Sequence, residues 1–183
     1  MEREEALELV NTYIKRENLI KHALAVEAIM KNIAKKLGED EKKWGIAGLL
    51  HDIDFEETFD NPALHGIKAG EILSGKVEED VIKAIRSHNF ENNKEEPESK
   101  MDFSLIAADS ISGLIIACAL VLPSRKLNDL KLETIERKFK QKDFARNCSR
   151  ERILYCEKCG ISLKEFFEIS LEALKSIAKE LGL

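Results

Sequence analysis

The sequence predicts an all-α fold, and three observations support this prediction. Apolar residues recur at spacings of three and four along almost the whole chain, no useful stretch alternates as a strand would, and only three prolines and nine glycines interrupt the pattern. The length of 183 residues and the hydrophobic fraction of 44% suit one sizeable core. We therefore expect a single helical domain that spans residues 1–183.

Start and stop signals divide the first half of the chain into four expected helices. Asparagine, aspartate and proline favour helix starts, whereas glycine favours helix ends because it adopts the left-handed conformation without strain. The expected helices are residues 3–16, a helix capped by Asn18 that stops at Gly38, a helix capped by Asp40 that ends near His51, and a helix from Asn61 and Pro62 to Ser74 and Gly75.

The second half of the chain contains the most apolar segment, residues 101–120, which we expect to form the central helix of the bundle. The last helix begins with a capping-box pattern, a serine followed three residues later by a glutamate. The expected elements are a helix over residues 78–88, an exposed polar loop over residues 89–100, the central helix ended by Pro123, shorter helices near residues 130–140 and 149–158, and a last helix that starts at Ser162.

The overall charge and the apolar runs disfavour several functional classes. The formal net charge is −5, so no global basic surface indicates binding to nucleic acid or to an anionic membrane. The first ten residues are acidic and lack the basic start and apolar core of a signal peptide. The longest apolar run, residues 114–123, is too short to span a bilayer. We expect a cytoplasmic protein without membrane contact, for which nucleic acid is disfavoured as a partner.

The four cysteines do not form a recognisable metal-binding set. Cys156 and Cys159 form a lone CxxC pair with Cys148 eight residues before it, and Cys118 lies in an apolar run. No second CxxC pair and no nearby histidine complete a set of four ligands. We therefore favour structural or incidental thiols over a zinc or redox site.

Six polar residues point inward from apolar helix faces. Any one inward histidine is most simply a core residue with a satisfied hydrogen bond, but here all four histidines and two aspartates share this placement. Each would cost about 1–3 kcal/mol if buried without a partner. A shared metal cluster satisfies them together, and imidazole with carboxylate suits iron, manganese, cobalt, nickel or zinc rather than calcium. The six residues are His22, His51, Asp52, His65, His88 and Asp109.

The order of these residues resembles a known family. His22, the adjacent pair His51 and Asp52, and Asp109 match the H…HD…D signature of the HD-domain metal-dependent phosphohydrolase superfamily, and "LLHDID" resembles its HDIG form with Asp54 in place of the glycine. The resemblance implies an HD-domain helical bundle over residues 18–120 and a C-terminal helical extension over residues 121–183. The segments "ALVLPSRKL" and "KFKQKDFARNCSRERI" are similar to a group of short prokaryotic predicted HD superfamily hydrolases.

The resemblance also implies roles for the six residues and for Asp54. His22, His51, Asp52 and Asp109 would hold one divalent ion, and Asp52 would bridge to a second ion held by His65 and His88. Water or hydroxide between the ions would be the nucleophile. The catalytic residues expected are His51, Asp52 and Asp54. Asp54 could orient a ligand histidine or a metal-bound water, or it could instead cap the next loop.

A small phosphorylated substrate follows from the same resemblance. The family hydrolyses phosphate esters and phosphoanhydrides, and an HD-type diadenosine tetraphosphate hydrolase with six such ligands makes a nucleotide the favoured substrate. The cyclic-di-GMP phosphodiesterase branch is disfavoured, because Phe55 stands where that branch carries lysine and its GYP tripeptide is missing. The candidate substrate contacts are Lys68, Asn89, Arg125 and Lys126.

Alternatives to these assignments remain open. Lys68 could be an ordinary exposed helix lysine, and the basic segment from Arg125 to Arg152 could be a solvated helical face balanced by acidic neighbours. A mixed-valence di-iron oxygenase of the inositol oxygenase type uses a similar ligand set, and a metal-binding sensor without turnover is a third possibility. The sequence predicts one or two metal ions per chain, and a homodimer is compatible with it.

Overall fold

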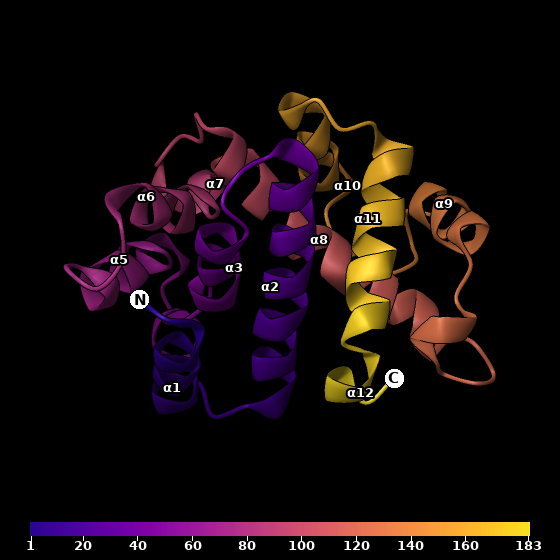
Figure 1. Ribbon diagram of the computed structural model, residues 1–183, viewed down its shortest axis with the longest axis horizontal. Coiled ribbons are helices and arrows are strands. Elements are labelled where there is room, and N and C mark those ends of the chain that lie inside the picture. The colour runs from indigo at the N-terminus through magenta and orange to yellow at the C-terminus, as the bar shows by residue number, and fades with distance from the viewer.

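The computed structural model describes residues 1–183 and consists of helices joined by turns, with no strand (Figure 1), which confirms the all-α prediction. The first elements are α1 (Arg3–Tyr13), α2 (Glu17–Leu37), α3 (Glu41–Leu50), α4 (Phe55–Thr58), the 3-10 turn η1 (Pro62–Leu64), α5 (Ile67–Leu73), α6 (Glu79–Ser87) and α7 (Phe90–Asn93). The others are α8 (Lys100–Leu120), η2 (Leu127–Asp129), α9 (Leu132–Lys140), α10 (Arg150–Ile153), η3 (Leu154–Cys159), α11 (Leu163–Ser176) and α12 (Ala178–Leu181).

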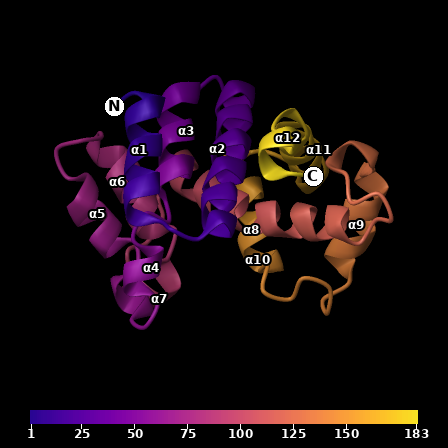
Figure 2. The ribbon, with the colours of Figure 1, turned by 90° about the horizontal axis from the view of Figure 1, so that it is seen from below.

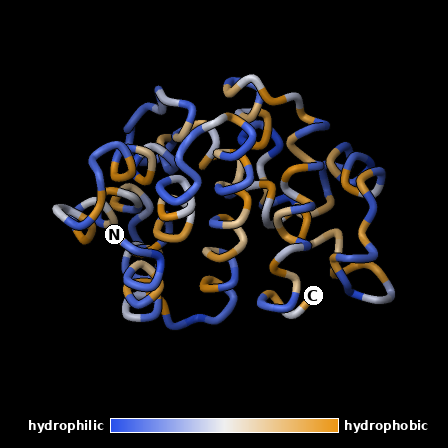
Figure 3. Tube along the Cα trace, viewed as in Figure 1, coloured by the Kyte–Doolittle hydropathy of each residue, from blue (hydrophilic) through white to orange (hydrophobic).

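Two groups of helices pack against α8. In Figures 1 and 2 the helices α1, α3, α5, α6 and α7 gather at one end of the molecule, and α9 to α12 gather at the other, with α2 between them. The helix α2 packs against α3, α8 and α11, and α8 contacts helices of both groups. One hydrophobic cluster runs from Ala6 to Leu181. Figure 3 shows hydrophilic residues over most outer turns and loops.

The helix α8 is the core helix, as the sequence predicts. The whole helix, unlike the apolar run 114–123 alone, is long and apolar enough to cross a membrane by length and composition, but 67% of its most apolar window is buried inside the protein. Its start is fixed by a capping box in which the Ser99 Oγ accepts from the Asp102 N–H at 3.1 Å and the Asp102 carboxylate accepts from the Ser99 N–H at 3.0 Å.

Local signals define several helix ends correctly. The Asp40 carboxylate accepts from the Lys43 N–H at 3.0 Å and begins α3, Gly38 ends α2 with φ of +71°, and the Ser162 Oγ accepts from the Glu165 N–H at the start of α11. These positions were predictable because each cap involves residues within one turn of the helix end.

The start of α2 differs from the prediction for a long-range reason. Asn18 does not cap it, and α1 already ends at Tyr13. The backbone N–H groups of Lys15 and Arg16 instead donate to the Glu56 carboxylate at 3.1 and 3.0 Å. A carboxylate some forty residues away thus satisfies the backbone before α2, and no local pattern encodes that contact.

The segment 61–74 is not the single helix that the sequence predicts. His65 has extended backbone between η1 and α5, so the expectation that it lies on a helix stripe is wrong. Gly66 follows with φ of +83°, and a Cβ there would lie 3.0 Å from the Ile85 carbonyl oxygen. The His65 carbonyl accepts from the Asn89 and Asn93 side chains, which hold this turn against α6 and α7. The predicted loop 89–100 therefore contains one short helix, α7.

The helices α2 and α3 approach closely at Gly48. A Cβ at this position would lie 2.8 Å from the carbonyl oxygen of Val26 and 3.0 Å from the Cα of Glu27, both of which are backbone atoms of α2. A glycine therefore lets the two helices meet. This contact sets the separation between His22 on α2 and His51 at the end of α3.

We predict that Gly48→Ala lowers the free energy of unfolding by about 1–3 kcal/mol, because the added methyl group forces two backbones apart. Gly45→Ala in the same helix is the matched control. A Cβ at Gly45 would meet only the Lys31 side chain, which can move more easily than a backbone, so this variant should cost clearly less stability than Gly48→Ala. Urea unfolding followed by circular dichroism measures both. Equal stability of the two variants would contradict the close-approach argument.

Candidate metal centre

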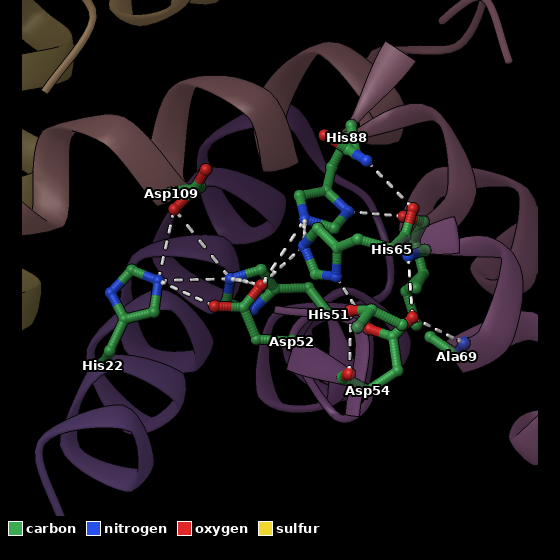
Figure 4. A network of polar contacts seen from close by, with 12 residues as sticks. His22, His51, Asp52, Asp54, His65, Ala69, His88 and Asp109 are labelled. Carbon is green, nitrogen blue, oxygen red and sulfur yellow. Dashed lines mark hydrogen bonds and ion pairs between the residues drawn. The ribbon is translucent and has the colours of Figure 1, made fainter. Parts of the chain in front are cut away.

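Six polar side chains converge at one point between the first group of helices and α8 (Figure 4). The helix α2 supplies one of them from its second turn, and the end of α3 supplies two adjacent residues. The turn before α5 and the end of α6 supply one each, and the middle of α8 supplies the last. They are His22, His51, Asp52, His65, His88 and Asp109.

The first ligand group surrounds the Nε2 atom of His22. This atom lies 3.2 Å from the Nε2 of His51, 3.2 Å from Oδ1 of Asp109 and 3.6 Å from Oδ2 of Asp52. The ligand atoms of His22, His51 and Asp52 are close enough to one another to share a single ion. Oδ1 of Asp109 lies beside them, 3.9 Å from the Nε2 of His51.

The second ligand group surrounds the other oxygen of Asp52. Its Oδ1 lies 3.2 Å from the Nε2 of His65 and 3.5 Å from the Nε2 of His88, and these two nitrogens are 3.1 Å apart. Asp52 is therefore common to both groups. In Figure 4 its carboxylate lies between His22 and Asp109 on one side and His65 and His88 on the other.

The outer nitrogen of each imidazole faces a hydrogen-bond partner. The Nδ1 atoms of His51 and His88 lie 2.8 and 2.5 Å from the carbonyl oxygens of Gly48 and Ile85, and can only donate to them. The Nδ1 of His65 faces the carboxylate of Asp54 at 2.8 Å. These contacts put the proton on Nδ1 of each ring, and they leave the Nε2 lone pair pointing into the cluster.

The same assignment holds for His22. Its Nδ1 lies 3.2 Å from the Ser112 hydroxyl, and that hydroxyl donates to the backbone carbonyl of Asp109 at 2.8 Å. The hydroxyl proton is thus already used, so the His22 Nδ1 donates to the oxygen and its Nε2 also presents a lone pair.

This donor chemistry fits a pair of divalent transition-metal ions. In each of the two histidine pairs, His22 with His51 and His65 with His88, the Nε2 atoms face each other at 3.1–3.2 Å, and carboxylates surround them. Lone pairs at this separation repel unless a positive charge lies between them. Imidazole nitrogens with carboxylate oxygens are the ligand set of iron, manganese, cobalt, nickel and zinc. The cluster therefore matches the predicted metal chemistry.

Both carboxylates of the cluster are held in the ionised form. Burial opposes the charge of Asp52, but the neighbouring His51 and His65 outweigh it and hold the pKa of Asp52 well below its ordinary value. Burial likewise opposes the charge of Asp109, yet its contact with His22 keeps the pKa of that carboxyl strongly lowered. Ionised carboxylates are what a cation requires.

The two histidines of the second group respond differently to the same surroundings. Burial disfavours a charged His65, but its contacts with Asp52 and Asp54 outweigh burial and raise the pKa of His65 to about 10. Burial and the nearby positive charge of His65 together lower the pKa of His88, which therefore keeps a free lone pair. The carboxylates attract positive charge to the centre of this group, which is the position that a metal ion would take.

Asp54 contacts a candidate ligand histidine and also caps the following segment, the two roles that the sequence left open. One carboxylate oxygen accepts from the Nδ1 of His65, and the other accepts from the N–H groups of Gly66 and Ala69 at 2.8 and 3.0 Å. The residue is fully buried and does not line the cavity. Asp54 thus orients a candidate ligand and caps the start of α5, so the structure gives it a positioning contact rather than contact with the reacting atoms.

A cavity of about 370 Å³ opens onto the cluster. Its floor consists of ligand side chains, and its walls come from both the first group of helices and the C-terminal extension. The lining residues are His22, Asp52, Phe55, His65, His88, Asn89, Asp109, Ser110, Gly113, Asn147, Cys148 and Arg152.

Of the predicted substrate contacts, only Asn89 lines this cavity. Its amide nitrogen is engaged with the carbonyl oxygens of Pro62 and His65, so it also holds the turn before α5. Lys68 pairs with Glu57 at 2.9 Å and lies outside the cavity. Arg125 and Lys126 are exposed beyond the C-terminal end of α8, and neither lines the cavity.

The segment 141–152 contributes to the site in a way that the sequence did not predict. The Arg150 guanidinium donates to six backbone carbonyls between Lys138 and Cys148 and folds this segment back on itself. The fold brings Asn147, Cys148 and Arg152 to the cavity wall. The basic composition of the segment was visible in the sequence, but composition does not say which arginine reaches inward.

The cysteines are free and lie outside the candidate ligand groups. Cys156 and Cys159 are buried, and burial raises the pKa of the Cys156 thiol to about 12. The Cys159 sulfur lies 3.2 Å from the Ser104 hydroxyl. A protonated, buried thiol is a poor metal ligand and a poor nucleophile, which supports a structural interpretation for this pair.

Comparison with known proteins now identifies the family. A family model described as the HD domain matches residues 19–114, just over half of the chain. The chain belongs to the HD domain family. The match includes all six cluster residues, and it ends before the extension that supplies Asn147, Cys148 and Arg152.

The curated relatives of this HD-domain chain include bacterial ribonucleases. Ribonuclease Y of Lawsonia intracellularis (strain PHE/MN1-00) is 31% identical over 139 residues, which are 74% of this chain and 26% of the relative. Ribonuclease Y of Bacillus subtilis (strain 168) is 30% identical over 170 residues, 90% of this chain and 32% of the relative. The chain thus spans about a quarter to a third of the length of these two proteins. No solved structure matches the chain.

These names weaken one expectation. Net charge alone disfavours nucleic acid as a partner, yet both relatives are named ribonucleases. A net charge of −5 averages over the surface and does not exclude local basic segments such as residues 137–152. Nucleic acid can therefore no longer be disfavoured on the basis of charge.

We predict that the chelator-treated protein takes up two Mn²⁺ or Co²⁺ ions per chain and gains thermal stability. An ion that binds only the folded state adds about 2.7 kcal/mol at a concentration one hundred times its Kd. Asp52→Asn should weaken both sites because this carboxylate belongs to both groups, whereas His88→Ala should leave one ion. Elemental analysis and thermal unfolding measure the effect.

The control for the metal experiment is Glu168→Gln, which makes the same kind of carboxylate-to-amide change at an exposed position of α11. It should bind two ions as the wild type does. Uptake of a single ion by the wild type, unchanged in His88→Ala, would contradict the second ligand group.

Proposed function

We propose that this HD-domain protein is a metal-dependent phosphohydrolase that cleaves a phosphate ester or phosphoanhydride bond of a nucleotide. The observation that carries the proposal is the carboxylate of Asp52 at the floor of an open cavity, which contacts histidines of both ligand groups. Its Oδ2 faces His22, and its Oδ1 faces His51, His65 and His88. A shared carboxylate favours a pair of ions a few ångströms apart, which is the arrangement suited to in-line displacement at phosphorus.

The side chains of this chain would divide the work as follows. His22, His51, Asp52 and Asp109 would hold one divalent ion, and His65 and His88 would hold the second together with Asp52. Bound ions of this kind lower the pKa of a water ligand and offset the charge that develops on phosphoryl oxygens. Asp54 would keep the His65 ring in its ligating orientation. The cavity would admit the phosphate and a limited part of the substrate around it.

An aromatic wall supports a nucleotide rather than a simple phosphate. Phe55 lines the cavity and packs edge-on against His65, with 5.5 Å between ring centroids. The ring centroid of Phe59 lies 6.1 Å from that of Phe55, and Phe59 is 63% exposed. The Arg16 guanidinium lies about 6 Å from the centroids of both rings. A half-buried aromatic ring in the cavity with an exposed one beside it is suited to stacking a base, worth about 1–3 kcal/mol.

A short single-stranded RNA is the second candidate substrate, and the comparisons favour it. The two ribonuclease Y relatives resemble most of this chain at 30–31% identity. Phosphodiester cleavage in RNA and hydrolysis of a nucleotide use the same chemistry at phosphorus, so the metal ligands alone do not separate them. The aromatic wall suits a base of either substrate.

The activity is tested with protein loaded with Mn²⁺, Co²⁺ or Fe²⁺ and offered p-nitrophenyl phosphate esters, nucleotides, dinucleoside polyphosphates and short RNA. We expect hydrolysis by the wild type and by Glu168→Gln. In Asp52→Asn the rate should fall by more than about a hundredfold, since changing even the partners behind metal ligands costs 10–100-fold. Oxygen consumption by the iron-loaded protein without hydrolysis of any phosphate would instead indicate the oxygenase alternative.

We predict that Phe55→Ala raises KM for a nucleotide by about tenfold, because it removes a stacking surface worth on the order of 1–3 kcal/mol. KM for an aliphatic ester such as glycerol phosphate should change little, because that substrate has no base. The ratio of the two KM values separates lost stacking from a general disturbance of His65, which would impair both substrates equally. An unchanged ratio would contradict the role of the aromatic wall.

A further inference from the structure

The C-terminal extension contributes the only cationic side chain, apart from histidines, that lines the cavity. This residue is Arg152 at the end of the segment 141–152. It lies outside the residues that match the HD domain, so the family match assigns nothing to it. Its side chain is largely buried, with 15% of its surface exposed.

The Arg152 guanidinium binds one residue from each ligand group. One terminal nitrogen donates to Oδ2 of Asp109 at 3.0 Å and to the backbone carbonyl of His88 at 2.7 Å. The other donates to the Glu91 carboxylate at 2.6 Å. The Oδ1 of Asp109 remains directed at His22. Arg152 therefore links the C-terminal extension to α8 through Asp109 and to the end of α6 through His88.

The guanidinium has more donors than the protein uses. It carries five N–H groups in a planar fork, and the contacts with Asp109, His88 and Glu91 use three of them. No other hydrogen bond from this side chain to the protein exists, although the residue lines an open cavity. A planar cation with spare donors beside a metal cluster matches the geometry of phosphate oxygens.

Other basic side chains near the site are excluded by their contacts. Arg150 is only two residues away, but backbone carbonyls take up its guanidinium. Lys68 is paired with Glu57 outside the cavity. Arg125 and Lys126 are exposed beyond the end of α8.

We propose that Arg152 binds a phosphoryl oxygen of the substrate and so makes the C-terminal extension part of the substrate site. This inference rests on the proposed phosphohydrolase function and adds a residue to it. Arg152 fixes the ligand carboxylate of Asp109 with one edge of its guanidinium and offers the remaining N–H groups to the phosphate. Substrates without an anionic phosphate oxygen gain nothing from it.

The test compares Arg152→Gln and Arg152→Lys with the wild type, using the full chain loaded with Mn²⁺. The probe is inorganic phosphate, and titration calorimetry measures its affinity. We expect phosphate to bind about ten- to hundredfold more weakly to Arg152→Gln, as for the loss of a charge-assisted hydrogen bond, with partial recovery in Arg152→Lys. Mn²⁺ stoichiometry, measured without phosphate, should be unchanged in both variants.

Two control variants separate this role from a local loss of structure. Arg146→Gln removes an exposed arginine from the same segment, and Glu91→Gln removes the partner of Arg152 that lies away from the ligands. Both should bind phosphate within about twofold of the wild type. If Glu91→Gln weakens phosphate binding as much as Arg152→Gln does, general loosening explains the effect and the proposal is overturned.

The remaining outcomes are equally clear. Equal phosphate affinity in Arg152→Gln and the wild type would overturn the proposal. Loss of Mn²⁺ in Arg152→Gln would also overturn it, because Arg152 would then act on Asp109 alone. Failure of the wild type to hydrolyse any phosphate substrate would count against the proposed function. That result comes from the turnover assay, whereas the role of Arg152 is tested by the phosphate affinities of the variants.

Discussion

The site depends on one electrostatic constraint, the convergence of imidazole lone pairs on the two oxygens of Asp52. The rings of His65 and His88 face each other through nitrogens 3.1 Å apart, and those of His22 and His51 do so at 3.2 Å. Carbonyl, carboxylate and hydroxyl partners fix the protons on the far side of each ring. Such a cluster is stable only with positive charge at its centre. The helices of the fold bring the six side chains together around that position.

The fold meets this constraint by close approach and by contacts from outside the family core. Gly48 lets α2 and α3 touch, and Gly66 turns the chain so that His65 reaches the cluster without being on a helix. The extension then closes one wall of the cavity. Arg150 folds the segment, and Arg152 connects it to Asp109. The ligands come from the HD core, whereas the wall that would select the substrate comes partly from the extension.

The parts that the sequence predicts are those governed by local rules. Helical periodicity locates α2, α3, α6 and α8, and with them the inward direction of His22, His88 and Asp109. Local caps fix the starts of α3 and α8 and the end of α2. The family signature adds the grouping of these residues around Asp52. Convergence of His22, His51, Asp52 and Asp109 is therefore the most predictable feature of the site, because the H…HD…D signature marks these four positions.

The parts that the sequence does not predict depend on long-range contacts. His65 leaves the expected helix because Asp54 and two asparagines bind its turn. Arg125 follows α8 closely in sequence, but the helix carries it about 1.5 Å per residue away from Asp109, whereas Arg152 returns through a folded segment. Proximity in sequence therefore misidentified the arginine at the cavity. No single-sequence pattern encodes the return of such a segment.

Electron paramagnetic resonance of the protein loaded with two equivalents of Mn²⁺ measures directly whether Asp52 joins two metal sites. If one carboxylate joins two ligand groups, the ions lie close together and give the spectrum of a spin-coupled pair. Asp52→Asn should abolish that coupling. A wild-type spectrum of isolated Mn²⁺ ions at full loading would contradict the account, because the imidazoles would then serve one ion and the second group would have no metal to hold.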